Sequence, residues 1–213
     1  MSNKIIQGDC IEEMKKILDK SIPLILTDIP YDVVNRKSNG LRKLDKGNAD
    51  ILTFNLQEFL KECNRICSGS IYIFCSSEQV SEIRSTLIEY GLSTRHCCWN
   101  KTNPSPMNGP SIWLSSMENC IYGKNKGATF NEHCKGVVWN FPTVKSKQHP
   151  TEKPLKLMEY LVSVSSSPGD IVLDPCCGSG TTCVAAKNLG RQYIGIDINF
   201  GYVEITKKRL NNE

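Results

Sequence analysis

The chain lacks long apolar runs: no stretch approaches the roughly 18 residues that a membrane-spanning helix needs. Its first residues, MSNKIIQGDC, do not follow the charged, apolar, small-residue order of a secretory signal. The sequence also contains no internal repeat and no low-complexity tract. From these absences we expect a cytoplasmic protein that has no membrane partner.

The paired C-x2-C spacing of a structural zinc site is also missing, although the chain has 11 cysteines. The closely spaced ones are Cys63 and Cys67, on a helical pattern, and the neighbours Cys97–Cys98 and Cys176–Cys177. Several cysteines lie within apolar runs, as expected for reduced thiols in a core rather than for disulfides of a small secreted protein. We therefore predict no metal site.

Length and composition indicate a single domain over residues 1–213, because 213 residues with 39% hydrophobic side chains can form one full core. The net charge of +4 is unevenly distributed. Residues 36–50 and 124–148 together hold ten Lys and Arg against three Asp and Glu, a net +7, which leaves −3 for the rest. Two basic segments with little helical or strand periodicity favour an anionic partner such as nucleic acid.

Short apolar runs alternate with helical spacing along the chain, a pattern typical of an α/β fold with a mostly parallel sheet covered on both faces. Helical spacing is clearest at Ile11/Met14/Leu18, Leu56/Phe59/Leu60/Cys63, Val80/Ile83/Leu87, Leu155/Met158/Leu161/Val162 and Phe200/Val203/Leu210, and we expect these stripes to form the core. The predicted strands are 4–7, 23–27, 70–75, 95–100, 119–123, 170–173 and 192–196.

The run DIVLDPCCGSGTTCVAAKNLGRQYIGIDI, residues 170–198, predicts a strand, a glycine loop, a helix ended by Gly190 and a second strand ending at Asp197. In such a unit the glycines let a ligand approach the backbone, and the acid after the second strand can bind ribose hydroxyls. Cys183 stands where a dinucleotide site would have its third glycine. The carboxylate of Asp174 would repel a pyrophosphate but suits a ligand with ammonium and sulfonium charges, which indicates S-adenosylmethionine.

Four motifs in their order then resemble one family, the β-class DNA amino-methyltransferases. DPCCGSG is similar to the cofactor loop of S-adenosylmethionine-dependent methyltransferases, and TDIPY, residues 27–31, resembles their catalytic Asp-Pro-Pro-Tyr motif. HPTEKP, residues 149–154, resembles the segment that opens the cofactor half, and WNKTNPSP, residues 99–106, the strand and loop after the catalytic half. The resemblance covers nearly the whole chain.

The resemblance implies a Rossmann-like single domain with a seven-stranded sheet, parallel except for one strand, and a circularly rearranged motif order. It places Asp9 at the adenine of the cofactor, with Cys10 beside it, although Asp9 is equally suited to cap a helix. It places Asp197 on the ribose and Gly178 and Gly180 against the methionine portion. The other cofactor-binding residues that it implies are Asp28, Thr151, Lys153, Pro154, Asp174, Cys176, Thr181 and Ile198.

The family's chemistry explains why a strand would end in Asp-Ile-Pro-Tyr. An exocyclic base amine is a poor nucleophile because its lone pair is delocalised, and two hydrogen-bond acceptors can draw it toward a tetrahedral geometry. The resemblance assigns these roles to the Asp28 carboxylate and the main-chain carbonyl of Ile29, with Pro30 shaping the turn and Tyr31 stacking on a flipped base. Ile29 departs from the family's usual Pro, but any residue can offer a carbonyl.

The basic segments are expected to contact DNA. Residues 32–50 form a predicted mobile loop in which Arg36, Lys37, Arg42 and Lys43 would hold phosphates. Residues 124–148 are a short predicted target-recognition segment, with Trp139 and Phe141 as wedges or as packing. Further predicted nucleic-acid contacts are Lys101, Lys135, Lys145 and Lys147. Because base readout needs side chains in a groove, so short a segment favours a very short target or the help of a second subunit or partner.

The sequence therefore favours a DNA methyltransferase acting on adenine N6, since Asp at the first motif position is the family's more frequent sign for adenine. Alternatives left open are a cytosine-N4 enzyme, an RNA amino-methyltransferase and a DNA-binding relative that has lost catalysis. A homodimer and a restriction endonuclease partner are further expectations from the resemblance.

Overall fold

The strands form one eight-stranded sheet in the order β1-β8-β7-β2-β3-β5-β4-β6. The computed structural model describes residues 3–31, 54–106, 109–144 and 152–212. The elements in chain order are β1 (Lys4–Gln7), α1 (Cys10–Lys15), β2 (Ile22–Asp28), α2 (Leu56–Ile66), β3 (Cys67–Cys75), α3 (Val80–Glu89), β4 (Ser93–Lys101), β5 (Met117–Lys124), β6 (Val138–Phe141), α4 (Leu155–Ser165), β7 (Ile171–Asp174), α5 (Thr181–Asn188), β8 (Gln192–Asp197) and α6 (Phe200–Asn212).

The sheet is parallel except at β5, which runs antiparallel to both β3 and β4. The other neighbouring strands pair in parallel. The predicted α/β class and the single reversed strand are thus confirmed, and all seven predicted strands are found. The sheet has one strand more than expected. This strand, β6, lies within residues 124–148, which the sequence predicted to be irregular, and it pairs with the end of β4.

Alternating side chains of the central strands supply two separate cores. In β2, Ile25 packs on one face, while Leu24 and Leu26 pack on the other. The same alternation in β3 sends Ile73 to the first core and Phe74 to the second. This alternation within strands that are apolar on both faces is typical of a parallel sheet between two helical layers.

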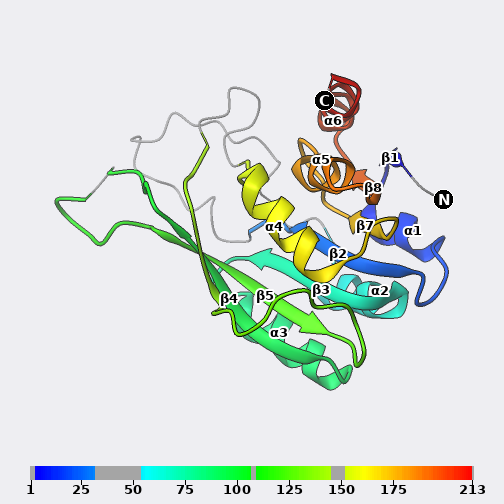
Figure 1. Ribbon diagram of the computed structural model, residues 1–213, viewed down its shortest axis with the longest axis horizontal. Coiled ribbons are helices and arrows are strands. Elements are labelled where there is room, and N and C mark those ends of the chain that lie inside the picture. The colour runs from blue at the N-terminus through cyan, green and yellow to red at the C-terminus, as the bar shows by residue number, and fades with distance from the viewer. Residues whose placement is uncertain (1–2, 32–53, 107–108, 145–151, 213) are drawn as a thin grey trace.

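Helices cover both faces of the sheet, with α1, α2 and α3 on one side and α4 and α5 on the other (Figure 1). The predicted apolar stripes are mostly buried, but two of their members are exposed. Leu18 is 70% exposed because α1 ends at Lys15, before the stripe does. Phe200 is 62% exposed at the first position of α6, which two residues separate from the end of β8.

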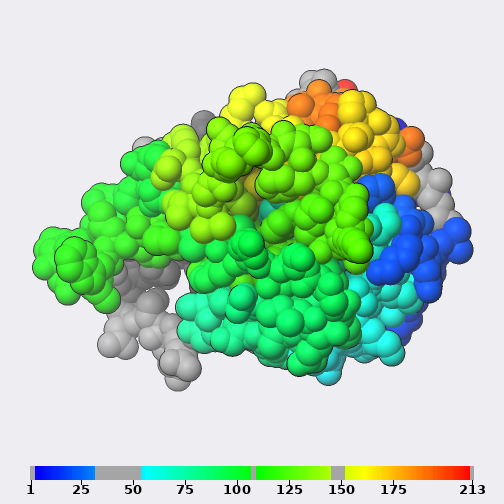
Figure 2. Space-filling view, turned by 60° about the horizontal axis from the view of Figure 1, so that its bottom comes forward, coloured from blue at the N-terminus to red at the C-terminus, as the bar shows by residue number. Residues whose placement is uncertain are grey.

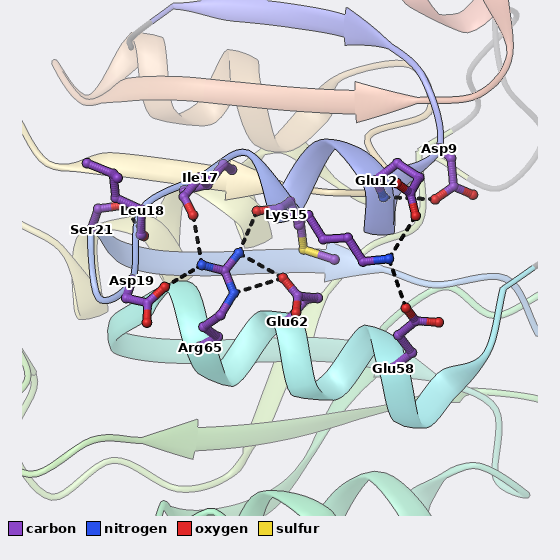
Figure 3. Close-up of polar contacts among 11 residues, drawn as sticks. Asp9, Glu12, Lys15, Ile17, Leu18, Asp19, Ser21, Glu58, Glu62 and Arg65 are labelled. Carbon is purple, nitrogen blue, oxygen red and sulfur yellow. Dashed lines mark hydrogen bonds and ion pairs between the residues drawn. The ribbon is translucent and has the colours of Figure 1, made fainter.

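Arg65 ties the end of α1 to α2 (Figure 3). Its guanidinium donates to the carbonyl oxygens of Met14 and Ile17, at 2.8 and 2.9 Å, which lie in the last turn of α1 and beyond it. Glu62, one turn earlier on α2, holds the same guanidinium at 2.7 Å. Since helix ends leave carbonyl groups without partners, Arg65 both caps α1 and fixes its position, and with it the position of Asp9.

Between β4 and β5, residues 102–106 and 109–116 extend from the body of the protein as an arm, the green lobe that projects in Figure 2. Trp113 on this arm is 95% exposed, and Ile112 is 67% exposed. The eleven cysteines, all within the described ranges, form no disulfide, and most are buried as the sequence predicted. Among the described helices, none is long and apolar enough to cross a membrane.

Candidate active site

Three carboxylates meet at one edge of the sheet because each ends a parallel strand. Asp28 ends β2, Asp174 ends β7 and Asp197 ends β8. In open α/β sheets this edge, at the carboxyl ends of the strands, is where ligands bind. The reversed strand β5 brings its first residues to the same edge, where Glu118 stands opposite Trp99 near the end of β4.

Asp28 lies within a partly buried group of polar side chains. One carboxylate oxygen accepts a hydrogen bond from the Tyr31 hydroxyl at 3.0 Å, and the other is bound by the ammonium of Lys153. Lys153 also contacts Glu118 at 3.0 Å, and Glu118 contacts Lys101 at 2.8 Å. The cluster therefore alternates two acids and two bases, with Asp28 at one end.

The charges in this cluster depend on one another. Burial raises the pKa of Asp28, and Lys153 opposes that effect. Burial likewise disfavours the ammonium of Lys153, but Asp28 and Glu118 outweigh it and raise the Lys153 pKa. For Glu118, burial is outweighed by Lys153 and Lys101, which lower its pKa to about 2. Burial and the Asp28 charge raise the pKa of Tyr31, so its hydroxyl stays protonated and donates to Asp28.

The turn after β2 is held by main-chain contacts. The N–H of Ile29 donates to the carbonyl of Phe74 on β3 at 3.2 Å, and the Ile29 side chain is only 1% exposed. The carbonyl of Pro30 accepts from the side chain of Gln79 at 3.2 Å. Ile29 has a main-chain N–H that the family's usual Pro at this position lacks. This N–H continues the hydrogen-bonded pairing of β2 with β3.

The glycine loop between β7 and α5 is shaped by two residues with left-handed backbones. Gly178 has φ +50°, and a Cβ there would meet no described atom within 4 Å, so this backbone faces open space. Gly180 has φ +85°, and a Cβ there would lie 2.3 Å from Cγ2 of Thr206 on α6. The hydroxyl of Thr206 in turn donates to the carbonyl of Gly178 at 2.8 Å.

Asp197 is oriented by two main-chain donors. Its carboxylate accepts from the N–H of Gly178 and the N–H of Asn199, each at 2.8 Å. The acid at the end of the second strand is therefore fixed against the glycine loop.

Arg209 on α6 and Glu152 join the loop to the segment before α4. Arg209 donates to the carbonyl of Ser179 at 2.9 Å and pairs with Glu152 at 2.8 Å. Glu152 also accepts from the hydroxyl of Thr181, the first residue of α5, at 3.1 Å. The adjacent residues Glu152 and Lys153 thus point to different places, the first to the glycine loop and the second to Asp28.

Asp9 and Cys10 lie at the same edge, after β1. Asp9 caps α1, since its side chain accepts from the N–H groups of Ile11 and Glu12 at 2.9 and 3.1 Å. The thiol of Cys10, the first residue of α1, contacts the thiol of Cys176 in the glycine loop. This hydrogen bond is the largest cause, and burial the next largest, of a raised pKa for the Cys176 thiol. Burial raises the pKa of Asp174 to about 7.

The family model described as DNA methylase matches residues 22–208 of this sequence. This chain belongs to the DNA methylase family. The resemblance to DNA amino-methyltransferases, read from four motifs, is confirmed at the level of the enzymes that modify N6 or N4 amines.

Two named relatives align with nearly all of this methylase. It is 33% identical to the type II methyltransferase M.HinfI of Haemophilus influenzae, over 98% of this chain and 68% of that protein. It is 32% identical to the DNA adenine methyltransferase YhdJ of Escherichia coli (strain K12), over 97% of this chain and 82% of that protein.

Solved structures agree on fold and cofactor. The M1.HpyAVI–SAM complex superposes with a TM-score of 0.77 at 31% identity and covers 98% of both chains. The cytosine-N4-specific PvuII DNA methyltransferase has the same TM-score at 18% identity, over 98% of this chain and 86% of that one, which shows the fold alone. The cofactor of this methylase is S-adenosylmethionine. The donor set fits it: a buried acid at Asp174 for cationic groups, a carboxylate at Asp197 for hydroxyls and open backbone at Gly178.

Most of the predicted cofactor residues of the methylase come together at this edge of the sheet. Pro154, buried, stands directly before α4, while Ile198 is 63% exposed after β8. Thr151 lies outside the described residues, and so do Arg36, Lys37, Arg42, Lys43, Lys145 and Lys147 together with the whole predicted loop 32–50. The roles of all these residues stay predictions.

Two predicted DNA contacts have different surroundings in the methylase. Lys135 is exposed, as a phosphate contact requires. Lys101 instead pairs with Glu118 inside the charged cluster, and its ammonium lies 5.4 Å from the Trp99 ring centroid. Of the two aromatic residues suggested as wedges, Trp139 is buried against Tyr72 in the core, and Phe141 packs partly buried against the same core. Packing is therefore the role that their surroundings support.

Sequence reasoning missed Glu118, Glu152 and Arg209. Glu152 stood in the quoted HPTEKP motif but was given no role, and Arg209 lies on the last helix, far from any motif. Glu118 carried a signal that could have been used: it is an acid at the start of the otherwise apolar run Cys120–Tyr122. A charged residue entering a buried strand needs a partner, which predicts a nearby cation.

Proposed function

We propose that this methylase transfers a methyl group to the exocyclic N6 amine of adenine in DNA, using Asp28 and the Ile29 carbonyl as the two acceptors. The observation that carries the proposal is the placement of Asp28 at the end of β2, where it is partly buried and paired with Lys153. Its likeness to YhdJ, which is named a DNA adenine methyltransferase, supports the choice of adenine.

The acceptors act on the amine by hydrogen bonding. An ionised Asp28 accepts one amine hydrogen and the Ile29 carbonyl accepts the other, which draws the nitrogen lone pair out of the ring and toward the methyl donor. Lys153 favours the ionised form of Asp28 in a site where burial opposes it. The contacts of Ile29 with Phe74 and of Pro30 with Gln79 hold the carbonyl in place before substrate arrives, so little reorganisation remains for the reaction.

Tyr31 must change partners when the base enters. Its hydroxyl occupies one oxygen of Asp28 at 3.0 Å in the free protein. A target amine that donates to this oxygen replaces the Tyr31 hydroxyl, and the ring then becomes available to stack on the flipped base. Lys153 keeps the second oxygen of Asp28 throughout, so the carboxylate stays paired during the exchange.

The cofactor residues hold their ligand from three strands. Asp197 would bind the ribose, Gly178 and Gly180 would lie against the methionine portion, and Asp174 would face its cationic groups. Asp9, fixed at the start of α1, would contact the adenine of the cofactor. When bound, S-adenosylmethionine supplies the methyl group as an electrophile on a sulfonium centre.

We further propose that residues 32–50 and 124–148 contact the phosphates and bases around the target. The first segment follows Tyr31 directly, and the second contains the exposed Lys135. The likeness to M.HinfI, a type II methyltransferase, supports a place beside a restriction endonuclease. The shortness of the second segment favours a homodimer, which light scattering of the purified protein would test.

The proposed function is tested by incubating the protein with labelled S-adenosylmethionine and mixed DNA and RNA of known sequence. Nucleosides are then separated and identified by mass spectrometry. We expect 6-methyladenine in DNA. Recovery of 4-methylcytosine alone contradicts the adenine assignment, label confined to RNA contradicts the DNA substrate, and absence of any product contradicts the activity itself.

A further inference from the structure

We propose that Glu118 is a positioning residue for methyl transfer: it fixes the Lys153 ammonium against Asp28 while the target base replaces Tyr31. The inference deepens the proposed function and rests on it for the role of Asp28. It assigns a role to a residue on β5, distant in sequence from both the catalytic motif and the cofactor loop.

Glu118 forms ion pairs with two lysines, one through each carboxylate oxygen. One of its oxygens binds Lys153 at 3.0 Å, and the other binds Lys101 at 2.8 Å. Both oxygens are thereby directed, because Lys101 ends β4 at the base of the arm and Lys153 precedes α4. Lys153, whose side chain is 5% exposed, is thus held from two sides by Asp28 and Glu118.

Lys153 needs a second anionic partner to fix its position because its side chain is long and flexible. A lysine ammonium on four methylene groups does not fix its own position, unlike the planar guanidinium of arginine. The ring centroids of Phe74 and Tyr31 lie 5.2 and 5.7 Å from Nζ, but the Tyr31 contact is lost if the ring turns to stack on a base. Glu118 is then the anionic partner that remains beside Asp28.

The charge on Glu118 is suited to this task. Lys153 and Lys101 outweigh burial and keep its pKa at about 2, so it remains an anion throughout the range in which an enzyme works. Asp28, by contrast, has its pKa raised by burial and depends on Lys153 to stay ionised. Glu118 therefore supports the charge of Asp28 through Lys153, although its own negative charge acts on Asp28 in the opposite sense.

Replacing Glu118 should shift the pKa of Asp28 in opposite directions according to which of these two influences dominates, and this difference makes the inference testable. If only its charge matters, Glu118→Gln lowers the pKa of Asp28, and Glu118→Asp, which keeps the charge, changes nothing. If Glu118 positions Lys153, both variants weaken the contact of Lys153 with Asp28 and so raise the pKa of Asp28. The other titratable groups facing Asp28 are unchanged in both variants: Tyr31 after β2, Cys75 on β3, Cys120 on β5 and Asp174 on β7.

The experiment follows the Asp28 carboxyl carbon by NMR through a pH titration of the full chain, in the unaltered protein and in Glu118→Gln, Glu118→Asp and Glu89→Gln. Glu89 is an exposed acid at the end of α3 and serves as the control for loss of one negative charge. We expect the Asp28 midpoint to rise by about one pH unit in Glu118→Gln and by less in Glu118→Asp, with no change in Glu89→Gln.

Single-turnover methylation of DNA at saturating cofactor provides the second readout. We expect the rate constant of Glu118→Gln to fall by up to about tenfold relative to the unaltered protein on the acid side of the Asp28 midpoint and to approach the unaltered value at higher pH, while cofactor affinity stays within about threefold. A midpoint that falls or stays in Glu118→Asp overturns the inference, even if Glu118→Gln does not fold. Absence of product from the unaltered protein contradicts the proposed function, whereas the titration still decides the role of Glu118.

Discussion

Replacement of Gly180 by Ala should destabilise this methylase for two separable reasons. The backbone at Gly180 has φ +85°, which costs an L-residue about 1–2 kcal/mol. The added Cβ would also lie 2.3 Å from Cγ2 of Thr206, and overpacking of this kind costs about 1–3 kcal/mol. We therefore expect Gly180→Ala to lower the free energy of unfolding by about 2–5 kcal/mol.

A matched control separates the two contributions. Gly91 also has φ +85°, but a Cβ there would meet no described atom within 4 Å, so Gly91→Ala should show the backbone cost alone, about 1–2 kcal/mol. Urea unfolding of both variants measures the difference. Adding Thr206→Ser, which removes Cγ2 and keeps the hydroxyl bonded to Gly178, should recover part of the loss in Gly180→Ala. Equal unfolding midpoints for Gly180→Ala and Gly91→Ala would refute the packing argument.

Three further predictions concern the chemistry. Asp28→Ala should abolish methyl transfer and leave cofactor affinity within a few-fold, whereas Asp197→Ala should weaken cofactor binding by about 1.5–3 kcal/mol; calorimetry of both variants checks this, and equal losses of affinity contradict the division of the site. Because burial raises the pKa of Asp174 to about 7 from 3.8, its contribution to stability is lost as pH rises between those values, while affinity for the cationic cofactor should rise by up to about tenfold from pH 6 to 8. A binding titration that shows the same pH dependence in Asp174→Asn would exclude that carboxyl as the source. Ile29→Pro should lower the free energy of unfolding by about 2–4 kcal/mol, because the buried side chain becomes smaller and the hydrogen bond to the Phe74 carbonyl is lost. The single-turnover rate of the folded enzyme should nevertheless stay within about tenfold. If the variant is folded and binds cofactor but is inactive, the Ile29 N–H or side chain takes part in the reaction.

The strands and the glycine loop could be predicted because their signals are local. Most of the predicted strands contain a short apolar run, and residues 170–198 contain a complete strand, loop, helix and strand. The strand β6 could not be found in this way, since Val138–Phe141 is four residues long and lies in a segment rich in Lys and Asn. Its pairing with β4 depends on side chains about 40 residues away, such as Asn100, which bonds to Asn140 at 2.7 Å.

The charged cluster was hidden from the sequence for a related reason. Lys153 stood in a recognised motif, but its contact with Asp28 joins residues 125 positions apart. Glu118 reaches the site only because β5 is reversed and brings its amino end to the edge where the other strands finish. The prediction that Lys101 contacts DNA rested on its charge and its neighbours in the chain, whereas the structure places the partly buried carboxylate of Glu118 beside it.

The position of β1 in the sheet has a consequence for the order in which the protein can assemble. Gln7 pairs with Asp197, and in the described sheet β8 is the only strand beside β1. At ribosomal rates of about 5–20 residues per second, β1 waits about 10–40 s for its partner strand to be made. The strands β2 and β3 are synthesised much earlier, so the half that contains Asp28 can form while the half that contains the glycine loop and Asp197 is still incomplete. A chain that stops before Gln192 therefore contains Asp28 at the end of β2 but lacks β8 and the Asp197 carboxylate that accepts from the glycine loop. On the proposed assignment of the site, such a chain should not bind S-adenosylmethionine.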